Sequence, residues 1–319
     1  MKIFILCLLA LGVGLIALTQ YLALQISVRF PPQGLFAKLG DVSLHFKDYP
    51  AAEGSGQLPI VFIHGASGNL RDLEEPLADK LKGKHRLIFI DRPGHGHSSR
   101  GSADDMHLPW GQARIVSELL KHLNIDKAII VGHSYGGGVA ASFAVNHPMQ
   151  TGGLIFLAPA THPWPGAGVT WHYDVTNVPV LGFLFAETVA IPFGHLVFED
   201  GVKGVFKPGA VPANYLERTG VKLLLRPDVF RNNAADVSAL YKAVVEVSPR
   251  YGEIDVPTSI ITGDQDDVVL ADIHSVGLKK QIEGAKLIWL EGVGHSPAWT
   301  SPEIVAQEIE RVNRAARSK

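Results

Sequence analysis

Short apolar runs alternate with longer amphipathic segments along most of this 319-residue chain. Residues 60–63 are apolar throughout, as expected of a strand buried on both faces, whereas apolar residues of 110–123 share one face of a helix. Strands that alternate with helices imply crossover connections, so the pattern predicts a mostly parallel sheet with helices on both faces. The predicted strands are 42–46, 60–63, 86–90, 128–131, 154–157, 258–262 and 287–290, and the predicted helices are 70–81, 110–123, 136–146, 273–282 and 302–316.

The alternation stops near residue 160 and resumes at residue 258, and the segment between is rich in Pro, Gly and aromatic residues. Such a segment is too long for a structureless loop in a compact domain. We therefore expect residues 160–247 to fold as a helical cap over the carboxyl ends of the strands, where sheets of this kind bind ligands. Residues 41–159 and 248–319 would then form the α/β core.

Residues 3–24 are almost entirely apolar, with Thr19 and Gln20 as the clear polar exceptions. A helix of that length measures about 33 Å, which is enough to cross a hydrocarbon core of about 30 Å. We therefore expect residues 1–26 to form an uncleaved transmembrane anchor and residues 27–40 to form a linker. A cleaved signal peptide is the alternative, although no good small-x-small cleavage site ends the apolar run.

Charge and cysteine content bear on location and partners. Lys2 and the terminal amine favour a cytoplasmic N-terminus, so we expect the domain that follows the anchor to lie outside the cytoplasm or, after signal cleavage, to be secreted. The formal net charge is −2 with scattered Lys and Arg, which argues against nucleic-acid binding. Cys7 is the only cysteine, so no intrachain disulfide forms. The oligomeric state is not determined by the sequence.

The sequence Gly132-His133-Ser134-Tyr135-Gly136 lies between a predicted buried strand and a predicted helix. A tight turn at this place exposes the Ser134 hydroxyl, and the two glycines keep neighbouring side chains away from it. The N-terminus of the following helix also favours developing negative charge. A serine that only caps a helix is the alternative, but the flanking elements favour a nucleophile.

A serine hydroxyl needs a base, and fourteen histidines compete for that role. His295 follows the last predicted strand on a Gly-rich loop, at the same edge of the sheet as Ser134. A carboxylate must orient the imidazole, and Asp264, Asp266 and Asp267 all follow the preceding strand. The residues alone do not choose among these three. The order Ser, Asp, His along the chain is the one expected for a triad on this kind of fold.

Several motifs, in order over most of the chain, resemble those of the α/β-hydrolase superfamily, in its serine-nucleophile, esterase- or lipase-like branch with a cap domain. Phe62-Ile63-His64-Gly65 resembles the family's His-Gly oxyanion loop, and Asp91-Arg92-Pro93-Gly94-His95-Gly96-His97-Ser98 resembles its Asp-Arg-Pro-Gly-x-Gly-x-Ser turn. Gly132 to Gly136 matches the nucleophile elbow, Gly263-x-x-Asp266 the acid, and Gly294-His295 the terminal histidine.

The resemblance implies an α/β-hydrolase fold with a catalytic triad of Ser134, Asp266 and His295. It also implies an oxyanion hole formed by the backbone N–H groups of Ala66 and Tyr135. The expected activity is hydrolysis of a small-molecule carboxylic ester through an acyl-enzyme, without a cofactor. Haloalkane dehalogenases and epoxide hydrolases use Asp at the elbow and are disfavoured by Ser134.

Other activities share the same residue pattern. Carbon–carbon bond hydrolases, lactonases, cofactor-free haloperoxidases and acyltransferases all resemble it, and a non-catalytic accessory protein could retain the fold. His95 and His97 have no nearby Cys or paired carboxylates, so we expect no metal site.

The cap segment is enriched in aromatic residues, which suit either an apolar acyl or aromatic substrate, the core of the cap itself, or contact with a membrane. The candidate substrate-binding residues are Trp164, Trp171, Phe183 and Phe185.

Overall fold

A computed structural model of the chain describes residues 1–54, 56–166 and 170–318. Its centre is an eight-stranded sheet in the order β1-β2-β4-β3-β5-β6-β7-β8. β2 pairs antiparallel with β1 and β4, and all the other neighbouring strands are parallel. The strands are β1 (Leu35–Leu39), β2 (Val42–Tyr49), β3 (Ile60–Ile63), β4 (Leu87–Ile90), β5 (Ala128–His133), β6 (Thr151–Leu157), β7 (Thr258–Gly263) and β8 (Lys286–Leu290).

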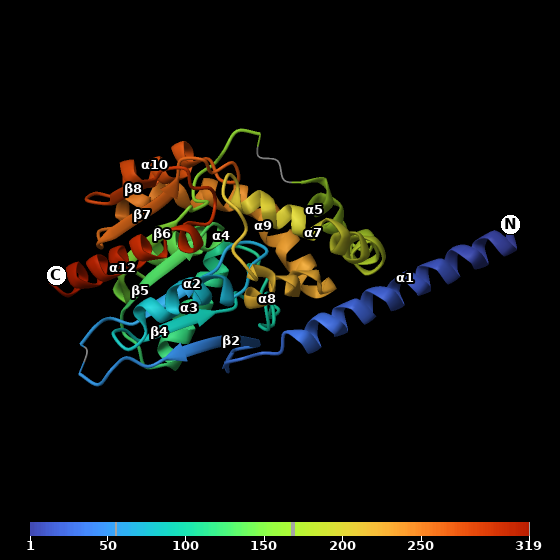
Figure 1. Cartoon of the computed structure of the whole chain (residues 1–319), viewed down its shortest axis with the longest axis horizontal. Helices are drawn as coiled ribbons and strands as arrows, with labels where there is room; N and C mark the ends of the chain where they lie inside the picture. Colours follow the sequence, from blue (N-terminus) through green and yellow to red (C-terminus); the bar gives the residue numbers. More distant parts are fainter. Residues whose placement is uncertain (55, 167–169, 319) are drawn as a thin grey trace.

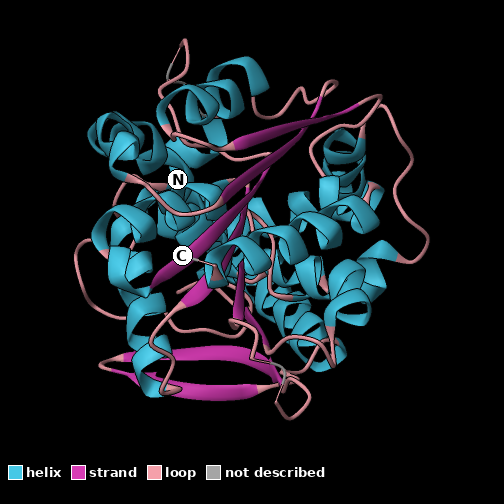
Figure 2. Cartoon of the chain, turned by 90° about the vertical axis from the view of Figure 1, so that its left-hand side faces the viewer, coloured by secondary structure: helices cyan, strands magenta, loops and turns pink. Residues whose placement is uncertain are grey.

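Two apolar layers, one on each face, hold the sheet between helices (Figure 2). Successive side chains of a strand point to opposite faces, so Val61 and Ile63 pack into one layer and Ile60 and Phe62 into the other. The first layer is completed by α3 (Pro109–His122), α4 (Tyr135–Asn146) and α10 (Ala271–Gln281), and the second by α2 (Arg71–Leu81) and α12 (Pro302–Arg317). The predicted α/β fold with a mostly parallel sheet is confirmed.

The range 27–40, which the sequence predicts to be a linker, differs in the structure. It contains the last turn of α1 (Lys2–Arg29) and the whole of β1. Ala37 and Leu39 are buried in the core, and β1 pairs with β2 along its length. The segment is therefore part of the sheet's edge, because its pairing partner and its two inward side chains stabilise an extended strand.

The segment between β6 and β7 is helical, as expected. It covers the end of the sheet at which β3, β5 and β8 finish (Figure 1). The C-terminal half of its longest helix packs into the core layer through Leu240, Val244 and Val247. Its elements are α5 (Trp171–Thr176), α6 (Leu181–Phe185), the π-helical turn η2 (Ala186–Ala190), α7 (Ile191–Phe206), α8 (Tyr215–Thr219), the 3-10 turn η3 (Val221–Leu225) and α9 (Pro227–Val247).

The N-terminal helix α1 extends away from the body of the protein on the side of this cap (Figure 1). Its last turns pack against the cap, where Ile26 and Phe30 join a cluster with Ala186, Ala190 and other cap residues. In the described chain, two helical segments are long and apolar enough to cross a membrane, and they are Lys2–Arg29 and Leu181–Phe206. The first is almost entirely free of protein contacts over its apolar window, whereas the second is partly buried in the cap.

Candidate active site

Ser134 joins β5 to α4 in a backbone conformation that non-glycine residues rarely adopt, with φ 53° and ψ −118°. The flanking glycines make this turn possible. A Cβ atom on Gly132 would lie 2.3 Å from the carbonyl oxygen of Gly136, and one on Gly136 would lie 2.3 Å from that of Ile63. The turn is therefore the strained strand-to-helix elbow that the sequence predicts, and it presents Ser134 at the carboxyl edge of the sheet.

His295 and Asp266 form a buried pair on the loops that follow β8 and β7. His295 Nδ1 lies 2.8 Å from Asp266 Oδ2, and it donates because an ionised carboxylate only accepts. Asp266 Oδ1 accepts the amides of Val268 and Val269, each at 2.9 Å. Burial alone would raise the pKa of Asp266, but the hydrogen bond and charge of His295, with the two amides, outweigh burial and lower this pKa. The carboxylate is thus ionised, and Nε2 of His295 is left as the basic nitrogen.

The two rival carboxylates are placed differently. Asp264 and Asp267 are exposed, and Asp264 Oδ1 accepts the amide of Gly292 at 2.7 Å. Asp264 therefore ties the loop after β7 to the loop after β8, whereas Asp266 contacts the imidazole of His295.

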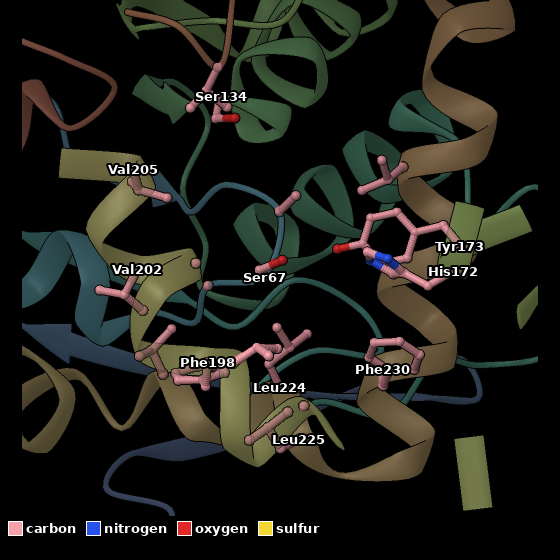
Figure 3. Close-up of a pocket in the computed structure, with 18 of the residues that line it drawn as sticks. Ser67, Ser134, His172, Tyr173, Phe198, Val202, Val205, Leu224, Leu225 and Phe230 are labelled. Carbon is pink, nitrogen blue, oxygen red and sulfur yellow. The ribbon is translucent and has the colours of Figure 1, made fainter. Parts of the chain in front are cut away.

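Ser134 and His295 line one cavity of about 490 Å³ beneath the cap, together with Ala66, Ser67 and Gly68 from the loop after β3. The side chain of Ser134 lies at one end of this cavity, and apolar side chains of the cap fill its opposite end (Figure 3). A group bound against Ser134 would therefore extend into apolar surroundings. The apolar end is lined by Phe198, Val202, Leu224, Leu225 and Phe230.

The loop after β3 touches the elbow. A Cβ atom on Gly65 would lie 3.0 Å from Ser134 Cβ, so any side chain here would crowd the elbow and glycine favours this close approach. The carbonyl oxygen of Gly65 accepts from His64 Nδ1 at 2.8 Å and from the guanidinium of Arg92 at 3.2 Å. In a trans peptide the N–H points opposite to the C=O, so these two bonds direct the Ala66 N–H away from the buried Arg92.

Tyr135, the other expected oxyanion donor, is the first residue of α4. The first amides of a helix have no partner within the helix, so they are free to bind a developing negative charge. The ring of Tyr135 is buried with the Arg92 guanidinium 4.3 Å from its centroid. Arg92 therefore contacts the ring of Tyr135 as well as the carbonyl oxygen of the peptide that carries the Ala66 N–H.

Helix α9 contacts the loops after β3 and β4 from the cap side, through two residues that the sequence analysis does not single out. Asp236 Oδ2 accepts from Arg92 at 2.7 Å, and Asp236 Oδ1 accepts from Arg100 at 2.7 Å. Asn233 Oδ1 accepts the amide of Ser67 at 2.7 Å. Asn233 and Asp236 are fully buried. No local motif marks them, because their role depends on a helix that is distant in sequence from the loop it supports.

His133, directly before the nucleophile, was also missed as a site residue. Its Nε2 donates to the carbonyl oxygen of His295 at 2.8 Å, and its ring lies 5.0 Å from the His295 ring. Burial of the imidazole and, to a smaller extent, the electrostatic effect of His295 lower the pKa of His133. A neutral His133 thus anchors the backbone of His295 beside the elbow. The signal available in the sequence was its position inside the elbow motif.

The four aromatic cap residues that the sequence singles out divide into two pairs. Trp171 and Phe185 line the cavity. Trp164 packs on Tyr241 and on the core instead. Phe183 is exposed and lies under the Arg231 guanidinium. The structure therefore brings only Trp171 and Phe185 of this group to the site.

The chain is similar to known proteins over most of its length. A model of the alpha/beta hydrolase family matches residues 60–308. The chain is 27% identical over 272 residues to a 2-hydroxy-6-oxononadienedioate/2-hydroxy-6-oxononatrienedioate hydrolase of Paraburkholderia xenovorans (strain LB400), covering 83% of this chain and 88% of the relative.

Solved structures with a similar fold include one from a study of carboxylesterases of Nitrososphaera gargenis, with a TM-score of 0.69 and 20% identity over 89% of this chain and 99% of that chain. The enol-lactonase from Burkholderia xenovorans LB400 gives a TM-score of 0.63 and 22% identity over 87% of this chain and 99% of that one. These likenesses show the shared fold.

Proposed function

We propose that this chain, which belongs to the alpha/beta hydrolase family, hydrolyses carboxylic esters with apolar acyl or aromatic groups through a covalent acyl-enzyme. One observation carries the proposal. Ser134, on its strained elbow, faces the same cavity as the hydrogen-bonded pair of His295 and Asp266. A hydroxyl, an imidazole and a carboxylate so arranged are the parts of a nucleophilic triad.

The mechanism follows from these positions. Ser134 Oγ attacks the ester carbonyl carbon while Nε2 of His295 takes the hydroxyl proton, and Asp266 stabilises the imidazolium that forms. The Ala66 and Tyr135 amides bind the negative oxygen of the tetrahedral intermediate. The intermediate collapses to the acyl-enzyme, and His295 returns the proton to the leaving alcohol. Water then attacks the acyl carbon while His295 takes a proton from it. The bond from the acyl carbon to Ser134 Oγ breaks, His295 returns the proton to Ser134 Oγ, and the acid leaves.

The lining of the cavity supports an uncharged, apolar substrate. Of the residues that the structure describes around it, none is Lys or Arg, and the acidic side chain of Asp72 is among them. A dicarboxylate such as the one in the name of the Paraburkholderia relative would be desolvated there without a cationic partner, which is costly. This favours an ester with an apolar acyl or aromatic group over that substrate.

A fluorophosphonate probe tests the nucleophile directly, because it reacts with activated serines. We expect the native chain to be labelled and Ser134→Ala to lose labelling. Ser296→Ala is the matched control, since Ser296 lines the same cavity without lying on an elbow. Failure to label the native chain, or undiminished labelling of Ser134→Ala, would contradict the proposal.

The substrate class is tested by p-nitrophenyl esters of increasing acyl length. We expect kcat/KM to rise with acyl length until the apolar end of the cavity is filled. Product analysis in the presence of competing alcohols separates hydrolysis from acyl transfer, and we expect the free acid to dominate. A preference for charged acyl groups would contradict the assignment of the cavity.

We also propose that α1 remains attached as a membrane anchor, with the catalytic domain outside the cytoplasm. Thr19, Ala23 and Ile26 of α1 are buried in the folded protein, and Gln20 Nε2 donates to Glu187 Oε2 of the cap at 2.6 Å. Cleavage after the apolar run would remove these contacts and expose a cap cluster. The intact mass of the protein purified from the membrane fraction should be that of the full chain if α1 is retained. Protease added to the outside of spheroplasts should digest the catalytic domain if this domain lies outside the cytoplasm.

A further inference from the structure

The cap carries a large exposed apolar surface. On α6, η2 and α7 the side chains that point to solvent include some of the most exposed large apolar residues outside α1, with Leu196 80% exposed and Phe193 57%. Contiguous exposed apolar surface of this kind marks a site of contact with a protein or a membrane. We call this surface the cap face, and its residues are Leu181, Leu184, Val189, Phe193, Leu196 and Val197.

The segment that carries the cap face is apolar on its inner side as well as on its outer side. Its opposite side is buried, with Ala186, Ala190 and Ile191 packed in the cap cluster that also contains Ile26 of α1. The last turns of α7 carry the charged residues of 199–203. A segment with one side packed on protein and an apolar outer side is suited to lie in the plane of a membrane interface rather than to cross it.

The anchor places a membrane beside this face. Residues 2–18 of α1 form a helix of about 26 Å, close to the hydrocarbon thickness of about 30 Å, and they extend beyond the cap on the side of α7 (Figure 1). Thr19 is the first fully buried residue of α1, and Gln20 is bonded to Glu187 in η2. The boundary between the free and the packed part of α1 therefore falls beside the elements that carry the cap face.

The cap face is also the rim of the candidate active-site cavity. Val189, Phe193 and Val197 belong to the cap face and line the cavity that reaches Ser134 and His295. Trp171, 66% exposed, lines the cavity as well. Val189, Phe193 and Val197 are thus exposed to solvent and also part of the cavity lining, so apolar side chains border the cavity on this side.

We propose that the cap face inserts into the interfacial layer of the lipid bilayer that holds α1, and that hydrophobic ester substrates enter the cavity from the bilayer. The route of the substrate rests on the proposed function, whereas the insertion of the cap face does not. The occupant of the cap face is lipid because the same chain supplies a helix that can cross a bilayer next to it.

A depth measurement tests the insertion without using activity. The full chain carries one cysteine, so Cys7→Ser with Leu196→Cys gives a single site for an NBD label. In vesicles of phosphatidylethanolamine and phosphatidylglycerol, we expect this label to be quenched by doxyl-labelled phosphatidylcholine. Met149→Cys in the same background is the control, because Met149 is 82% exposed but lies at the amino ends of the parallel strands, away from the cap.

Equal quenching of the two labels would overturn the insertion. The insertion would also be overturned if the NBD label at position 196 has blue-shifted fluorescence that doxyl lipid does not quench. That result would show the cap face covered by a second copy of the chain or by another protein.

A second measurement tests the substrate route. Leu184→Asp with Leu196→Asp places two carboxylates on the cap face, and neither residue lines the cavity. We expect kcat/KM for a long-chain ester presented in vesicles to fall by about tenfold or more, since charges are costly in the apolar interface. Hydrolysis of soluble p-nitrophenyl acetate and fluorophosphonate labelling should stay unchanged, and Met149→Asp should change none of the three.

An equal fall for both esters would overturn the route. If the native chain is not labelled by fluorophosphonate, the proposed function fails, while the quenching result still decides the insertion.

Discussion

The guanidinium of Arg92 donates to the carbonyl oxygen of Gly65 at 3.2 Å, from a fully buried position beneath the loop that follows β3. This bond sets the orientation of the peptide that joins Gly65 to Ala66, and hence the direction of one of the two proposed oxyanion donors. Arg92, which is not among the described residues that line the cavity, thereby helps to set the orientation of a peptide beside Ser134.

Arg92→Lys should therefore lower kcat with little change in KM. A lysine keeps the charge opposite Asp236 but lacks the forked donors that reach Asp236 and Gly65 together. Loss of a whole oxyanion donor costs about 10²–10³ in kcat, so we expect a fall of about 10- to 100-fold for a misaligned one. Steady-state kinetics with a p-nitrophenyl ester gives the measurement.

Arg100→Lys is the control for Arg92→Lys. Arg100 pairs with the same Asp236 but bonds to Met106 and Asn232 rather than to Gly65. Equal losses of kcat in the two variants would show that the pairing with Asp236, and not the orientation of the Gly65 peptide, is what matters.

The assignment of the acid is tested by a pair of isosteric changes. Asp266→Asn should lower kcat by about a hundredfold or more, because the amide cannot stabilise the imidazolium of His295. Asp264→Asn should change kcat by less than about threefold, since Asp264 bonds to a loop amide instead. A larger loss from Asp264→Asn, in the same kinetic assay, would refute the assignment. Ser134→Ala and His295→Ala should each cost at least about a thousandfold.

Asn233 is expected to hold the Ser67 end of the same loop. Asn233→Ala removes the acceptor of the Ser67 amide and should lower kcat by about tenfold, with KM changed less. Asn232→Ala is its neighbour control, because Asn232 donates to Gly94 on another loop. The interpretation fails if the two variants lose kcat equally, or if only the melting temperature falls.

Stability should decrease in mild acid. Burial of the imidazole and, to a smaller extent, the charge of Arg92 lower the pKa of His64 to about 3. A histidine in the unfolded chain titrates near 6.5. As pH falls below 6.5 the unfolded chain binds a proton that the native chain does not, so the stability contributed by the neutral His64 is lost. The loss for one such group is about 2 kcal/mol between pH 7.5 and 5.

Thermal unfolding in mild detergent at pH 7.5 and 5 measures this effect. The decrease of Tm on acidification should be smaller in His64→Gln than in the native chain. His122→Gln, a change at an exposed histidine, should keep the full decrease. An identical decrease in all three proteins would contradict the account.

Residues on the loops that follow the strands could be predicted from the sequence. The apolar runs of β3, β5, β7 and β8 indicate which ends meet, and the order of Ser134, Asp266 and His295 follows from that. The choice of Asp266 over Asp264 and Asp267 required family resemblance, because three carboxylates on one loop have the same local pattern. Only the fold shows which of them contacts His295.

Features that depend on contacts between distant segments could not be predicted. β1 lies in a Pro- and Gly-containing stretch and is stabilised by pairing with β2, which its own sequence does not reveal. Trp164 has the residue type expected in a substrate pocket, but it packs on Tyr241 from α9. The support that Asn233 and Asp236 give to the site likewise arises only when α9 docks on the core.

The buried ion pairs of Asp236 with Arg92 and Arg100 join α9 of the cap to the core. Lifting α9 away would strand the guanidinium of Arg92 in an apolar interior without its counter-ion Asp236, at a cost of several kcal/mol. The burial of this ion pair therefore fastens α9 to the core, and the same helix carries Asn233, the acceptor for the Ser67 amide, so the loop beside Ser134 and the covering helix are held by one set of contacts.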